Sequence, residues 1–190
     1  VLFRSGSRNY VHGTDIVNAL LEYSAITQDE NGILSSVKFR SFARETVYFA
    51  METCSSTEFE QIGTFSLNGT SLKRGYIYSG HPIVSKRIDY DETVFSYTVD
   101  TKLQSVVSTE QKYTVIEDLV PLVKILHYEL FPSGQKKWVF VQLDLDREFP
   151  AKYQRLEAKI IQVINETFTV ADFIIDNVFC GKIRFSKASP

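Results

Sequence analysis

The segment 127–146 contains side chains that together have the composition of a ligand pocket. His127, Trp138 and Phe140 supply an imidazole and two aromatic rings, and Gln142 and Asp144 add an amide and a carboxylate. Small-molecule pockets are mostly apolar, with a few polar groups that orient the ligand. We therefore expect these five residues to bind a ligand, with His127 as a candidate catalytic base. The competing interpretation is that the polar end of this segment is simply exposed to water.

A second histidine and two arginines complete the set of candidates. His12 and Gly13 precede a predicted helix, where free N–H groups can hold an anion and a histidine can transfer a proton. An ordinary capping turn is the alternative. Arg40 and Arg44 flank a break in strand periodicity and are candidate ligands for a carboxylate or phosphate. Surface ion pairs with acids such as Glu45 would explain the arginines equally well.

A β-hairpin over residues 122–147 is the element predicted to position the pocket. Both arms are rich in β-branched and aromatic residues, and a Pro-Ser-Gly-Gln turn separates them. A two-residue loop would pair His127 with Phe140 and Ile125 with Gln142. Because side chains alternate along a strand, the candidate pocket residues would then share one face.

Two helices are expected to pack on the sheet, over residues 14–24 and 150–166. Thr14 supplies an N-cap oxygen for the first helix. Pro150 opens the second, which has an apolar stripe at helical spacing. The segment 168–179 fits either a helix or a hairpin, and its β-branched residues favour strands.

Several further strands are predicted. Asn68-Gly69 is a strong signal for a two-residue hairpin loop between two strand-like runs, with Phe65, Leu67, Leu72 and Tyr76 on one face. Residues 35–52 indicate one bulged strand or two separate strands. The remaining segments are two strand-like runs, at 83–90 and 93–99, and a loop at 28–32. Residues 103–118 are predicted to be a loop with a possible short strand or helix.

These elements predict an α+β fold with a mainly antiparallel, curved sheet of about 6–9 strands. An N-terminal helix and a C-terminal-region helix would cover the sheet, in a single domain spanning residues 1–190. Residues 1–8 are left out of the functional argument. Hot-dog and chorismate-lyase-like folds both have layouts of this kind, and no sequence motif selects between them.

Composition and motifs exclude several classes of partner and cofactor. A net charge of −2 and a pI near 6.0 argue against nucleic acid or an anionic membrane as a partner. No apolar run is long enough to span a bilayer, so a soluble, cytoplasmic protein is expected. Cys54 and Cys180 lack metal-ligand spacing, and Asp144 with Asp146 is too weak a pattern to predict a metal. No phosphate-binding glycine motif is present, so no cofactor is expected.

The leading hypothesis is a small-molecule-binding protein with a mixed aromatic and polar pocket. The first alternative is an enzyme acting on a small organic acid or acyl thioester, with His127 or His12 as general base and Arg40 or Arg44 as anion contact. The second alternative is a protein-interaction module or homo-oligomer, because aromatic residues are also enriched at interfaces.

Overall fold

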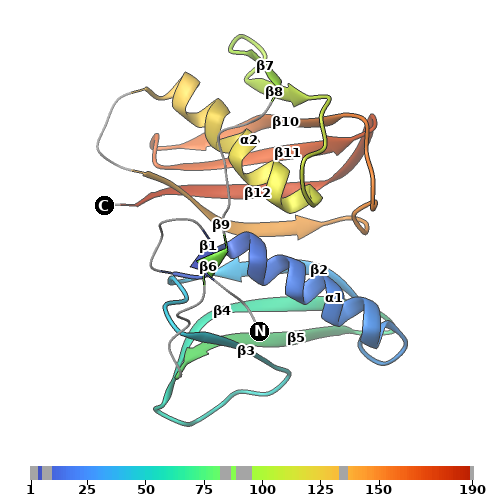
Figure 1. Cartoon of the computed structure of the whole chain (residues 1–190), viewed down its shortest axis with the longest axis vertical. Helices are drawn as coiled ribbons and strands as arrows, with labels where there is room; N and C mark the ends of the chain where they lie inside the picture. Colours follow the sequence, from blue (N-terminus) through green and yellow to red (C-terminus); the bar gives the residue numbers. More distant parts are fainter. Residues whose placement is uncertain (1–3, 6–9, 82–86, 89–95, 133–136, 189–190) are drawn as a thin grey trace. The chain divides into compact units, whose positions relative to one another are not determined.

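The computed structural model describes residues 4–5, 10–81, 87–88, 96–132 and 137–188 (Figure 1). The chain divides into two compact units, Val1–Asp91 and Glu92–Pro190. Each unit is built from one helix and an antiparallel sheet. The expectation of a single domain over residues 1–190 stays a prediction.

The first unit has a four-stranded antiparallel sheet in the order β3-β5-β4-β2, and α1 packs on β2 and β4. A short parallel pair, β1 with β6, belongs to the same unit. The elements are β1 (Arg4–Ser5), α1 (Gly13–Asn31), β2 (Ile33–Phe39), β3 (Thr46–Ala50), β4 (Phe59–Asn68), β5 (Leu72–Gly80) and β6 (Arg87–Ile88).

The predicted N-terminal helix is confirmed, and it is longer than expected. Ile16, Val17 and Leu20 are buried as the apolar stripe requires. The helix continues to Asn31, so the loop predicted at 28–32 is wrong. Gly32 ends the helix with a φ of 87°, a conformation that a residue without a side chain adopts at low cost.

The hairpin at Asn68 is also confirmed, although its inner face differs from the prediction. Asn68 pairs with Leu72, so the loop has three residues rather than two. Leu72 is exposed, and Ile77 rather than Tyr76 is buried. Residues 35–52 form two strands, β2 and β3, as the second interpretation proposed.

The second unit has a six-stranded antiparallel sheet in the order β9-β12-β11-β10-β8-β7. Helix α2 lies across the sheet and contacts β8, β10 and β9 (Figure 1). The elements are β7 (Tyr97–Asp100), β8 (Ser105–Ser108), α2 (Val115–Leu130), β9 (Lys137–Leu145), β10 (Leu156–Ile164), β11 (Phe168–Ile175) and β12 (Val178–Ala188).

The predicted hairpin over residues 122–147 is wrong in its first arm, which is the second half of α2. Thr114 caps this helix, and Glu117 completes a capping box by accepting from the Thr114 N–H. The buried residues follow helical rather than strand spacing. They are Val115, Ile116, Asp118, Leu119, Val120, Pro121, Leu122, Val123, Leu126 and His127. The predicted loop at 103–118 therefore contains β8 and the start of α2.

The second arm of that hairpin is a strand as predicted, but its partner is β12. The pairing of His127 with Phe140 and of Ile125 with Gln142 is therefore wrong. A bulge at Val141 shifts the phase of β9, because Arg184 pairs with Gln142 and Phe185 pairs with Phe140. The turn residues 133–136 lie outside the described residues.

The helix predicted over residues 150–166 is wrong, because most of that segment is strand β10. Leu156, Ala158 and Ile160 are buried at a period of two, and β10 pairs with both β11 and β8. The second helix of the fold is α2, which precedes this segment. The preference for strands over 168–179 is confirmed by β11 and β12.

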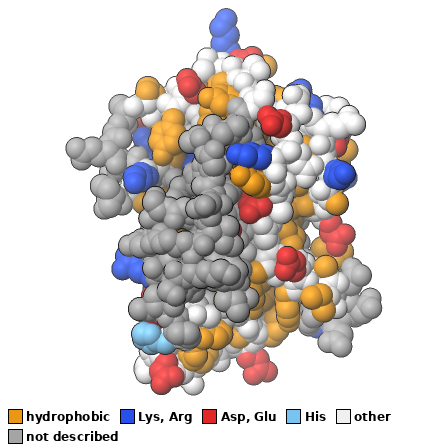
Figure 2. All heavy atoms as spheres, viewed as in Figure 1, with side chains coloured by type: hydrophobic (Ala, Val, Ile, Leu, Met, Phe, Trp, Pro, Cys, Tyr) orange, Lys and Arg blue, Asp and Glu red, His pale blue; other side chains and the backbone are white. Residues whose placement is uncertain are grey.

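The fold is therefore α+β with antiparallel sheet strands and two helices in the described residues. The sheet strands number ten, four in the first unit and six in the second, which is more than predicted. No helix in the described part of the chain is long and apolar enough to cross a membrane. On the face visible in Figure 2, the coloured acidic and basic side chains are interspersed rather than gathered by sign.

Candidate functional site

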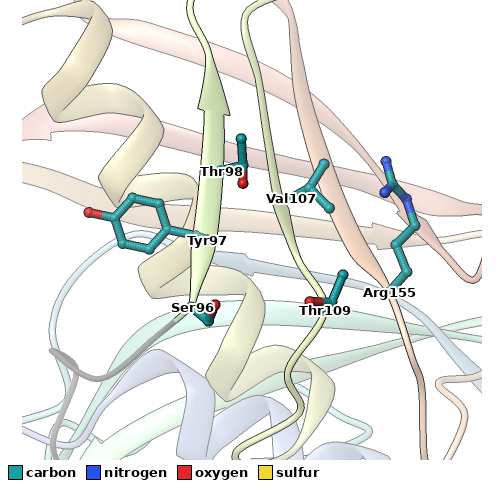
Figure 3. Close-up of a pocket in the computed structure, with 6 residues that line it drawn as sticks. All are labelled: Ser96, Tyr97, Thr98, Val107, Thr109 and Arg155. Carbon is teal, nitrogen blue, oxygen red and sulfur yellow. The ribbon is translucent and has the colours of Figure 1, made fainter.

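A hollow of about 320 Å³ lies at the β7–β8 edge of the second unit (Figure 3). Four of its six lining residues carry a hydroxyl group, and the other two contribute a guanidinium and an aliphatic side chain. In Figure 3, Thr98 and Val107 lie side by side and Arg155 rises beyond them, whereas the Tyr97 ring is directed away. The lining residues are Ser96, Tyr97, Thr98, Val107, Thr109 and Arg155.

The strand register places these residues, apart from Tyr97, on one face of the sheet. Thr98 pairs with Val107, and Val107 pairs with Glu157 on β10. The alternating residues Ser108 and Leu156 point into the core and are buried. Because side chains alternate along strands, the hollow opens on the face that does not hold these core residues.

Arg155 is held in place by the β11–β12 turn. Its N–H donates to Asp176 Oδ1 at 2.8 Å, and its carbonyl accepts from the Asp176 N–H at 2.9 Å. Gln154 also donates its N–H to the same carboxylate, at 2.9 Å. Asp176 and Asn177 both have positive φ, 49° and 65°, as a two-residue type I′ hairpin requires. The backbone of Arg155 is therefore fixed before any ligand binds.

The guanidinium of Arg155 is only partly satisfied. Its Nη2 donates to Glu157 Oε2 at 2.8 Å, with the Arg155 side chain 40% exposed. Its Nε is covered and has no hydrogen-bond partner among the described residues. A buried donor without an acceptor costs about 1–3 kcal/mol.

A buried carboxylate ties the segment before Arg155 to the start of α2. Asp118 accepts from the Tyr153 hydroxyl at 2.7 Å and from the N–H groups of Lys112 and Tyr113 at 3.0 and 3.1 Å. The Tyr153 N–H also donates to Gln111 Oε1, at 3.0 Å. Burial raises the pKa of Asp118, and these bonds oppose that shift. Burial and the bond to Asp118 raise the pKa of Tyr153.

His127 lies in the dry core of the second unit. Its Nδ1 donates to the carbonyl of Val123 at 2.7 Å, so its Nε2 accepts from the Thr169 hydroxyl at 2.5 Å. The ring lies 4.2 Å from that of Trp138 and 5.0 Å from that of Phe185. Burial lowers the pKa of His127 to about 4, so the imidazole is neutral at pH 7.

The structure brings His127 together with Trp138 and Phe140, but not with the other two predicted pocket residues. Trp138 and Phe140 are buried with the core, on the same side as Leu143. After the bulge at Val141, Gln142 and Asp144 alternate with buried leucines and so lie on the opposite face. There Asp144 accepts from Gln142 at 3.0 Å and forms an ion pair with Arg184.

The other three candidates belong to the first unit. His12 is buried immediately before α1, and its carbonyl accepts from the Ile16 N–H at 3.2 Å. Arg40 and Arg44 are exposed in the segment between β2 and β3. Glu45 lies 3.6 Å from His81 Nδ1.

Metal and thiol chemistry receive no support from the described residues. They contain no group of three His, Cys, Asp or Glu side chains arranged to hold a metal ion. Cys54 is exposed, and Cys180 is buried with a pKa raised by burial. A raised pKa disfavours the reactive thiolate.

Sequence inspection did not single out the residues of the hollow. Arg155 lay within a predicted helix, and Thr109 lay within a predicted loop. The β-branched pair Ile160-Ile161 and the Asp176-Asn177 dipeptide were the signals for the strands that position Arg155.

No family model matches the sequence, and no curated protein matches it. Solved structures resemble it in fold at low sequence identity. The tesB protein of Mycobacterium avium subspecies paratuberculosis matches with a TM-score of 0.50 and 12% identity, over 95% of this chain and 88% of that one. The pyran synthase domain from module nine of the sorangicin pathway matches with a TM-score of 0.51 and 9% identity, over 92% and 85%.

A third match is the dehydratase domain from the CurJ module of curacin polyketide synthase. It has a TM-score of 0.50 and 9% identity, and the match covers 100% of this chain and 86% of that domain. At these identities the matches show the fold alone. The structural neighbours are hot-dog-fold domains, and one antiparallel sheet with one helix in each unit agrees with that fold.

Proposed function

We propose that this protein binds small acyl compounds, either acyl thioesters or the corresponding organic acids, in the hollow beside Arg155. The observation that carries the proposal is the guanidinium itself, which borders the hollow on a backbone fixed by Asp176. Hydroxyl groups of Ser96 and Thr109 lie in the same wall and can donate to a carbonyl or carboxylate oxygen. Val107 offers an apolar contact for an acyl chain.

The fold supports the same class of ligand. The similar structures include a protein described as tesB and a domain described as a dehydratase of a polyketide synthase. An enzyme on an acyl thioester is one of the alternatives that the sequence allows. The hollow adds a site in this chain where such a compound would bind.

Thermal shift measurements test the proposal. The panel contains butyryl-N-acetylcysteamine, butyryl-CoA, butyrate and butyramide. A ligand at about 100 times its Kd stabilises the native state by about 2.7 kcal/mol, or roughly 5–10 °C in melting temperature. We expect at least one acyl compound to give such a shift, and Arg155→Gln to abolish it.

Arg147→Gln is the matched control, because Arg147 is exposed beyond the end of β9 and its replacement removes the same charge. We expect this variant to retain the shift. Equal loss of the shift in both variants, or no shift from any acyl compound, would overturn the proposal.

Catalysis on the bound compound is a second proposal, which the fold of the similar structures favours. His127, which belongs to the same unit as the hollow, would serve as general base in the neutral form that its environment maintains. Both ring nitrogens of His127 are hydrogen-bonded in the described structure, so Thr169 would have to release Nε2 first. His12, Arg40 and Arg44 lie in the first unit, where they stay candidates for a separate acid–base and anion site.

Thiol release from butyryl-N-acetylcysteamine measures this activity directly. We expect turnover that His127→Gln removes while the thermal shift with ligand persists. Binding without thiol release in the unmodified protein would argue against a thioester hydrolase and leave the binding proposal intact.

A further inference from the structure

The charges around the hollow restrict what can bind there. Arg155 is neutralised by Glu157, whose carboxylate lies 2.8 Å from Nη2. Asp176 accepts the Arg155 N–H, and Glu110 accepts the Ser96 N–H at 3.4 Å. Three carboxylates thus contact residues of the wall, which carries one guanidinium. A second anion placed against this cluster would be repelled rather than attracted.

The nearest basic side chain along β10 does not alter this balance. Lys159 lies on the same strand face as Glu157, two residues further on, and pairs across the sheet with Asp172. Asp172 also accepts from Lys182 Nζ at 2.5 Å. Lys182 in turn pairs with Asp144 on β9, so the four charges of this neighbouring row alternate in sign and sum to zero.

The hydrogen-bonding capacity of the wall is suited to an uncharged acceptor. The hydroxyls of Ser96, Thr98 and Thr109 can each donate one bond, and the guanidinium of Arg155 borders the same hollow. A carbonyl oxygen can accept two such bonds without bringing a negative charge. A site with one neutralised guanidinium and several hydroxyl donors therefore favours a carbonyl over a carboxylate.

We infer that the hollow recognises an uncharged carbonyl oxygen, as found in a thioester, ester or amide, in preference to a carboxylate or phosphate. This inference rests on the proposed function and narrows it, because it assigns Arg155 to the acyl carbonyl rather than to the anionic end of a ligand. The residues that carry it are Arg155, Glu157 and the hydroxyls of the wall (Figure 3).

Calorimetric titration with three matched probes tests the inference. Butyryl-N-acetylcysteamine, N-methylbutyramide and butyrate share one acyl chain and differ in the charge and kind of the carbonyl group. We expect the thioester or the amide to bind at least about threefold more tightly than butyrate at low salt, the effect of one nearby unit charge in water. A preference for the thioester over the amide, or the reverse, identifies which carbonyl the site takes.

Tighter binding of butyrate would overturn the inference and leave the proposed acyl binding intact. Absence of binding by all three probes would overturn both. The two failures are therefore distinguishable in one set of titrations.

Two variants test the electrostatic basis separately. Glu157→Gln removes the neutralising charge, and we expect the ratio of butyrate to amide affinity to rise about threefold or more. Asp176→Asn removes a second charge while keeping an Oδ1 acceptor and a residue that tolerates positive φ, so Arg155 stays anchored. Glu148→Gln, at an exposed position, is the control. An unchanged ratio in both test variants would refute the charge argument.

Discussion

Acidification should destabilise this protein through His127. The imidazole is fully buried, and burial lowers its pKa from 6.5 to about 4. In the unfolded chain the same group takes up a proton near pH 6.5, so between pH 6.5 and 4 the unfolded state binds more protons. The stabilisation is fully present above pH 6.5 and is lost as the pH falls toward 4.

The expected magnitude follows from that difference in pKa. Each unit corresponds to about 1.4 kcal/mol, so the whole shift is worth about 3 kcal/mol, of which about 2 kcal/mol is lost between pH 7 and pH 5. Urea unfolding at a series of pH values measures this loss. His127→Gln should flatten the pH profile by about that amount, although the variant is less stable at pH 7.

His81→Gln provides the control, because the side chain of His81 is 77% exposed. Its pH profile should match that of the unmodified protein. The reasoning is refuted if His127→Gln loses as much stability between pH 7 and pH 5 as the unmodified protein does. Such a result would mean that His127 is not held neutral by the core.

Two further substitutions test one buried contact in each unit. Gly75→Ala places a methyl group against the ring of Phe65, which is buried. We expect the free energy of unfolding in urea to fall by about 1–3 kcal/mol. A fall below about 0.5 kcal/mol would contradict this contact. Tyr153→Phe removes a hydroxyl donor from the buried carboxylate of Asp118 and should cost about 1.5–3 kcal/mol. An unchanged unfolding midpoint would show that Asp118 has another donor.

Local signals predicted the first unit better than the second. Helix α1 follows from an apolar stripe that contains Ile16 and Leu20, and the β4–β5 hairpin follows from Asn68-Gly69. In both cases the residues that set the structure are adjacent in sequence. The break in strand periodicity within residues 35–52 likewise falls between the end of β2 and the start of β3.

The prediction from sequence failed in the second unit because apolar residues in two segments fit both helical and strand spacing. Residues 122–131 are apolar enough to satisfy either a strand or a helix, and Thr114 with Glu117, the capping box that favours a helix, lies upstream. Residues 156–164 show apolar positions at helical spacing, while their true pattern is Leu156, Ala158 and Ile160. Pairing with β8 and β11 decides the conformation, and a single sequence does not reveal such long-range pairing.

The candidate site could not be predicted because its residues converge only in the folded sheet. Thr98, Val107 and Glu157 become neighbours through two strand pairings. Arg155 is then positioned by Asp176, which lies in a turn 21 residues away. By contrast, the predicted grouping of His127 with Gln142 depended on a register that α2 makes impossible.

A titration followed by two-dimensional amide NMR tests the central proposal most directly. Isotope-labelled protein would be titrated with butyryl-N-acetylcysteamine, and amide shifts would be mapped onto the second unit. We predict saturable shifts centred on the N–H groups of Thr98, Thr109 and Arg155, absent in Arg155→Gln and retained in Arg147→Gln. Saturable shifts centred elsewhere in the chain, with these three amides unmoved, would contradict the assignment of the site.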